Sequence, residues 1–200
     1  MEKLAPAHYP IQDLIQRRWS PLAFRDRPIP MTDLARLLEA ARWSPSSYNE
    51  QPWVFLVAEK YINPTGFNKL LSCLVEANQV WAARAPVLMI GLAKNHFAHN
   101  NTVNRHAFYD LGAAVAYLTL QAMDLGIYVH QMAGFDPVKT REVAQVPSSH
   151  EPVVAIALGY YGELSSLPPN YQERERGPRN RNPLKDIAFR DTWGDSFPLP

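Results

Sequence analysis

Hydrophobic and polar positions along this chain follow two periods. Apolar residues spaced three and four apart predict helices over about 11–18, from Thr32 onward, and over about 105–125. Thr32 is expected to cap the second helix, and Gly126 is expected to end the third. The third and longest helix carries an apolar stripe formed by Phe108, Leu111, Val115, Leu118, Ala122 and Leu125.

Shorter apolar runs predict strands, at 53–58, 86–93, 127–129 and 152–160. A further helix is expected over about 67–83, ending before Pro86, and the polar residues 94–104 are expected to form a loop. Asp136 followed by Pro137 marks another helix start, because Asp caps well and Pro suits the first turn. Helices and strands are therefore mixed along one chain that shows no internal repeat.

Composition narrows the class of protein. The chain has 200 residues, 46% of them hydrophobic, which suits a single domain with a substantial core. Its formal net charge of +1 gives no overall attraction to nucleic acid or to an anionic membrane. The single cysteine, Cys73, lies in an apolar context and fits a buried position in a reducing cytoplasm. No apolar run approaches the ~20 residues of a spanning helix, and the first residues show no secretory signal.

The loop at 45–53 is rich in hydroxyl and side-chain amide groups, and it joins an amphipathic helix to an apolar strand. These groups donate and accept hydrogen bonds without net charge, which suits a flat heterocycle that carries carbonyls and ring nitrogens. The alternative interpretation is a Ser/Asn/Pro turn that only connects the two elements.

After Leu164 the chain becomes rich in Pro and Arg and then ends in the aromatics Phe189, Trp193 and Phe197. We expect residues from about 165 to 200 to form an extended tail that packs on this subunit or on another copy. Arg179 and Arg181 lie in this tail, and local composition alone favours a continuation of the solvated charge run of 173–176.

The remaining histidines and glycines match no known metal-binding or nucleotide-binding motif. His96, His99 and His106 surround a loop without a Cys or carboxylate companion, and their spacing matches no established metal site. The glycines form neither a dinucleotide fingerprint nor a phosphate loop. We therefore expect no metal site.

Five segments, taken together and in order, resemble the nitroreductase-like family of FMN-dependent flavoproteins. The pattern Arg-x-Ser-x-x-x-Phe begins at Arg18, and Pro-Ser-x-x-Asn-x-Gln-Pro-Trp begins at Pro45. Arg-x-Arg-x-Pro-Leu begins at Arg179, and the stretches 76–81 and 131–136 lie between. The resemblance covers about residues 11–194. It implies an α+β fold with a central, mostly antiparallel sheet surrounded by helices, in an intertwined homodimer that binds FMN at two shared sites.

The resemblance also implies roles for individual residues. Arg18 and Ser20 match the positions that meet the flavin phosphate and ring, and Arg179 and Arg181 match the basic pair that closes on the phosphate. Residues that match contacts from the second subunit are Ser46, Ser47, Asn49 and, as a further candidate, Gln51. Asn78 matches a ring contact, and Gly134 matches the residue whose backbone N–H faces the flavin N5. The other positions expected around the cofactor are Trp19, Leu22, Pro45, Trp81, Met132 and Ala133.

Three of these positions depart from the family pattern. Leu22 and Trp81 stand where members often carry cations, and Ala133 stands where Glu is frequent. Charge beside the ring tunes its redox potential, so these changes bear on turnover and on the second substrate rather than on phosphate binding.

The sequence thus predicts a cytoplasmic, homodimeric FMN-dependent oxidoreductase. NADH or NADPH is the expected electron donor, and a small nitroaromatic, quinone or similar molecule is the expected acceptor in a ping-pong reaction. The alternatives are a non-catalytic flavin-binding protein, a specialised dehalogenase or flavin-fragmenting enzyme on the same scaffold, and a structural dimer without flavin.

Overall fold

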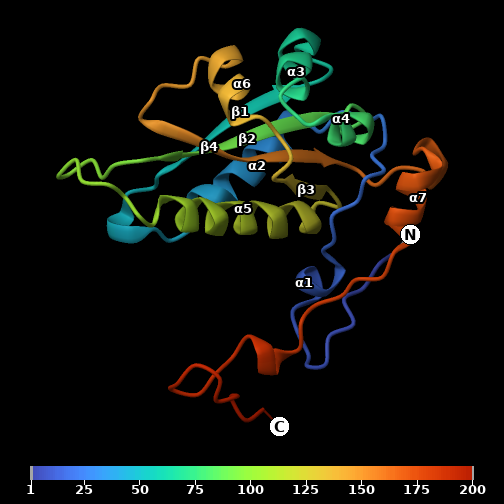
Figure 1. Ribbon diagram of the computed structural model, residues 1–200. Coiled ribbons are helices and arrows are strands. Elements are labelled where there is room, and N and C mark those ends of the chain that lie inside the picture. The colour runs from blue at the N-terminus through green and yellow to red at the C-terminus, as the bar shows by residue number, and fades with distance from the viewer. Residues whose placement is uncertain (1, 200) are drawn as a thin grey trace.

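The computed structural model describes residues 2–199, and an antiparallel sheet forms its centre (Figure 1). The strands lie in the order β1 (Trp53–Glu59), β2 (Val87–Lys94), β4 (His150–Gly159) and β3 (Tyr128–Met132). Every neighbouring pair in this sheet is antiparallel. The expected α+β class with a central antiparallel sheet is confirmed.

Strand β2 shows why the sheet lies inside the molecule. Its side chains alternate between two core clusters: Leu88 and Ile90 face one side, whereas Val87 and Met89 face the other. A strand covered on both faces needs an apolar residue at nearly every position, which explains its unbroken apolar run.

Helices cover both faces of the sheet (Figure 1). The helices α2 (Met31–Arg42) and α5 (Ala107–Asp124) pack on one face and on each other. The opposite face is covered by α3 (Pro64–Leu71), α4 (Glu76–Ala82) and α6 (Pro137–Val143). Asp136 caps α6 by accepting a hydrogen bond from the Lys139 N–H, and Gly126 follows α5 with φ 67°, as predicted.

The helix predicted over 67–83 is wrong as a single element, because the chain breaks between α3 and α4. The backbone there bonds to a distant segment instead of continuing the helix. The Asp136 N–H donates to the Cys73 carbonyl at 2.7 Å, and the Val75 N–H donates to the Gly134 carbonyl at 3.1 Å. This break brings Asn78, at the start of α4, close to Gly134.

Two further details of the helix predictions are wrong. Helix α2 starts at Met31 after Pro30, so Thr32 lies within its first turn and does not cap it. Phe108 is 54% exposed and does not belong to the buried stripe of α5. The inner face instead includes the buried Asp110, which accepts a hydrogen bond from the Ser47 N–H at 3.1 Å.

The two ends of the chain run side by side and project from the body (Figure 1). They carry α1 (Asp13–Arg17), η2 (Leu164–Ser166), α7 (Pro169–Arg176) and η3 (Leu184–Asp186). Helix α7 was not predicted, since the Pro- and Arg-rich composition of its segment resembles a tail. Beyond it Trp193 is 88% exposed, with its ring centroid 4.8 Å from that of Phe189. The packing of this tail on a second copy stays a prediction.

Candidate functional site

Three arginines predicted to act together do gather where the two ends of the chain meet. Arg18 directly follows α1 in an extended conformation, and its Nη1 donates to the Ser20 hydroxyl at 3.2 Å. Burial lowers the pKa of the Arg18 guanidinium, and the positive charges of Arg179 and Arg181 lower it further. The like charges are therefore close enough to disfavour one another.

The backbone of the N-terminal segment holds Arg179 in place. Its Nη1 donates to the Lys3 carbonyl at 2.6 Å and to the Gln16 carbonyl at 2.9 Å. Burial and the neighbouring Arg181 lower the pKa of Arg179. Sequence reasoning missed the contribution of residues 3 and 16, because any residue type can offer a backbone carbonyl.

No carboxylate neutralises the arginine cluster. Among the ion pairs found within residues 2–199, none includes Arg18, Arg179 or Arg181. The three side chains border a cavity of about 720 Å³ between the N-terminal segment and the tail. Guanidinium groups that converge without an acidic partner form a site for an anion such as a phosphate.

A second group of predicted residues meets between β3 and α4. The Asn78 side-chain amide donates to the Gly134 carbonyl at 3.0 Å. A Cβ atom on Gly134 would lie only 2.6 Å from the Asn78 Nδ2, so a side chain at this position would displace the Asn78 amide. Within the described chain the Gly134 N–H donates to no acceptor, which leaves it available to a ligand.

The polar loop contains η1 (Ser47–Asn49) and has a strained backbone. Tyr48, Asn49 and Gln51 have φ angles of 54°, 53° and 49°, a region that residues other than glycine adopt at a cost. Glu50 helps to hold this conformation, since its carboxylate accepts from the Lys94 ammonium and the Ala98 N–H, each at 2.9 Å.

The loop satisfies only some of its own polar groups. The Ser46 hydroxyl accepts from the Gln51 N–H at 3.0 Å, and the Gln51 amide donates to the Asn49 carbonyl at 3.1 Å. The Ser47 hydroxyl and the Asn49 side-chain amide make no hydrogen bond within the described residues. Asn49 is exposed, so its amide is open to solvent or to a ligand.

The polar loop and the arginine cluster lie apart in one chain. The loop packs beside the first turn of α5, where Asp110 binds it, whereas α1 lies below the opposite half of α5 (Figure 1). One copy therefore does not bring the two predicted halves of the site together.

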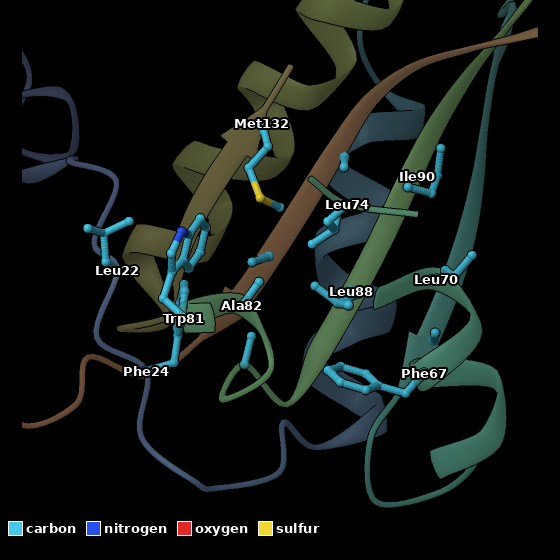
Figure 2. Close-up of a cluster of buried hydrophobic side chains, with 14 of the residues drawn as sticks. Leu22, Phe24, Phe67, Leu70, Leu74, Trp81, Ala82, Leu88, Ile90 and Met132 are labelled. Carbon is cyan, nitrogen blue, oxygen red and sulfur yellow. The ribbon is translucent and has the colours of Figure 1, made fainter. Parts of the chain in front are cut away.

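Several residues expected near the cofactor lie in the core. Trp19, Leu22, Trp81 and Met132 are each at most 4% exposed. Figure 2 shows Trp81 between Leu22 and Met132, and its indole ring lies 4.5 Å from the imidazole of His130. Pro45 and Ala133, in contrast, are exposed. Cofactor contacts by these six residues stay predictions.

A family model described as the nitroreductase family matches residues 15–160. The chain belongs to this family. The matched region contains Arg18, the polar loop, Asn78 and Gly134, whereas Arg179 and Arg181 follow it.

Other members and a solved structure resemble this nitroreductase-family chain over most of their length. A crystal structure of an oxidoreductase containing FMN is 34% identical, covers 95% of this chain and 96% of its own, and superimposes with a TM-score of 0.89. An uncharacterised 15.4 kDa protein of Mycolicibacterium smegmatis is 33% identical over 62% of this chain and 83% of its own length. A Stenotrophomonas maltophilia protein, provisionally named NADH dehydrogenase/NAD(P)H nitroreductase, is 29% identical over 74% of this chain and 82% of its own.

Across residues 2–199, no three His, Cys, Asp or Glu side chains gather in a way that could hold a metal ion. Over the same span, no helix has both the length and the apolarity needed to cross a bilayer.

Proposed function

We propose that this nitroreductase-family oxidoreductase binds FMN and transfers electrons from NADH or NADPH to a small acceptor such as a nitroaromatic or a quinone. The observation that carries the proposal is the unneutralised cluster of Arg18, Arg179 and Arg181. The FMN content of the structure that is 34% identical supports the cofactor, and the provisional name of the S. maltophilia relative supports the donor.

The residues of the chain fit a flavin mononucleotide. The arginine cluster supplies charge-assisted donors for one terminal phosphate. The free N–H of Gly134 supplies a backbone donor for the ring edge, and Asn78 holds the carbonyl of the same residue. Bound FMN would supply the hydride-accepting and electron-donating chemistry that the side chains lack. Because hydride transfer needs no side-chain acid or base, the chain's own part is to bind and orient.

We further propose that the site is completed by a second copy of the chain. The free Ser47 hydroxyl and Asn49 amide belong to the polar loop at the start of α5, whereas α1, which precedes Arg18, lies below the opposite half of that helix (Figure 1). Helix α5 exposes Phe108, Tyr109 and Tyr117 by 54%, 76% and 45%. Covering these aromatic side chains with a second copy would remove apolar surface from water.

The protein is accordingly expected to be a dimer at sub-micromolar concentration. Burial of the exposed aromatics on α5 and in the tail would stabilise the association. Analytical ultracentrifugation with absorbance detected at the flavin band measures the mass of the species that carries the cofactor. A monomer loaded with flavin would refute the shared site.

The catalytic part of the proposal is tested by steady-state kinetics. NADH or NADPH oxidation should depend on an added nitroaromatic or quinone, and double-reciprocal plots at several acceptor concentrations should give parallel lines. Leu22 and Trp81 are buried apolar residues at positions where family members often carry cations. Because charge beside the ring tunes its redox potential, their absence favours a flavin-binding protein without turnover as the second candidate. Tight FMN binding without acceptor-dependent oxidation of either nicotinamide would select that candidate.

A further inference from the structure

Glu175 is a buried acid beside the arginine cluster that no motif singled out. It lies on α7 and is 2% exposed. Its carboxylate accepts hydrogen bonds from two successive backbone N–H groups, those of Leu22 at 2.9 Å and Ala23 at 3.2 Å. Burying a carboxylate costs stability unless such donors satisfy it.

The charges around Glu175 are positive. Burial raises the pKa of its carboxyl, and the bonds from Leu22 and Ala23 together with the positive charges of Lys3 and Arg174 oppose that rise. Lys3 also joins α7 to the N-terminal segment, because its ammonium donates to the Glu175 backbone carbonyl at 2.5 Å. The carbonyl of Lys3 in turn accepts the bond from Arg179.

These contacts connect the segments that carry the arginines. Arg18 lies four residues before Leu22, and Arg179 lies four residues after Glu175. The guanidinium groups repel one another, so attraction between them does not account for their meeting. The Glu175 carboxylate instead joins the backbone at Leu22 and Ala23, shortly after Arg18, to α7, shortly before Arg179.

We propose that Glu175 is a positioning residue for the phosphate end of the cofactor, an inference that rests on the proposed function. It touches no ligand itself. It acts by fixing the backbone at Leu22 and Ala23, so that Arg18 faces Arg179 and Arg181 across one anion site.

The test separates positioning from general stability by comparing two ligands. FMN and riboflavin share the ring and the ribityl chain, and they differ only in the phosphate. A residue that merely stabilises the fold affects the two dissociation constants alike, whereas a residue that positions the arginines changes their ratio.

The variant is Glu175→Gln, and the control is Glu173→Gln on the same helix. Glutamine keeps the size of glutamate, but its amide nitrogen cannot accept from a backbone N–H. The Glu173 side chain is exposed and makes no hydrogen bond in the described chain, so its replacement changes the net charge equally without disturbing the bonds to Leu22 and Ala23. Flavin fluorescence titration measures both dissociation constants.

We expect Glu175→Gln to lower the FMN preference over riboflavin about tenfold, the size of a weakened charge-assisted contact. Glu173→Gln should keep the wild-type ratio. If the wild-type protein itself shows no preference for FMN, the proposed phosphate site fails. If the wild type prefers FMN and Glu175→Gln retains the full preference, Glu175 has no positioning role.

If Glu175→Gln does not fold, Glu175→Asp replaces it. Aspartate keeps the charge but withdraws both oxygens by one methylene, which lengthens the bonds to Leu22 and Ala23. A reduced FMN-to-riboflavin ratio supports the inference, and an unchanged ratio overturns it.

Discussion

Replacing Arg179 and Arg181 together with alanine is expected to weaken FMN binding by about a hundredfold or more. Each charge-assisted hydrogen bond to a phosphate contributes roughly 1.5–3 kcal/mol, and a factor of ten corresponds to about 1.4 kcal/mol. Arg179 also ties down the N-terminal segment through Lys3 and Gln16, so its loss loosens the cluster further. Titration of the apoprotein with FMN measures the effect.

A matched control for the pair is Arg25→Ala with Arg176→Ala. Both residues are exposed, and their side chains make no hydrogen bond or ion pair in the described chain. The control removes the same charge, so it shows how much of the loss comes from the overall field of the protein. If the Arg179 and Arg181 variant binds FMN as tightly as the wild type, the two arginines belong to a solvated tail.

The second large effect is expected at Gly134. Replacing this residue with valine should slow flavin reduction by NADH or NADPH about tenfold to a hundredfold, since misplacement by about 1 Å can cost that much in rate. A Cβ would lie 2.6 Å from the Asn78 Nδ2 and 3.0 Å from a Val75 methyl group. The variant must therefore displace the Asn78 amide or shift the backbone of residue 134, and its added methyl groups crowd the free N–H. Anaerobic stopped-flow absorbance measures the rate.

Two internal comparisons keep this result interpretable. The thermal unfolding midpoint shows whether the variant is folded, and the FMN dissociation constant shows whether the arginine cluster still works. Gly134→Ala should slow reduction less than Gly134→Val, because it adds only the first carbon. Equal rates in the wild type and in Gly134→Val would remove Gly134 from the site.

The elements predicted correctly are those that local sequence controls. The apolar run at 86–93 marks the central strand, and Gly126 and Asp136 mark helix ends through their own backbone and side-chain chemistry. The break between α3 and α4 was not predictable in this way. It depends on hydrogen bonds to Gly134 and Asp136, residues about sixty positions away.

The residues of the candidate site also differ in whether local sequence or distant contacts determine them. Local motifs identified Arg18, Asn78 and Gly134, and the structure brings Asn78 to Gly134 and Arg18 to the two tail arginines. The hydrogen bonds that support these residues could not be predicted from the sequence, because each joins a side chain to a distant backbone group. Glu175 is the main case, since it lies in a charge run that reads as solvated, yet it is buried.

The central claim is that the bound flavin takes electrons from a nicotinamide, and an anaerobic visible spectrum tests it most directly. The purified protein, reconstituted with FMN, should show an oxidised flavin band that bleaches when NADH or NADPH is added. A nitroaromatic or quinone, added next without oxygen, should restore the band. If dithionite bleaches the flavin while neither nicotinamide does so at millimolar concentration, the protein binds flavin without catalysing this reaction, and the central claim is wrong.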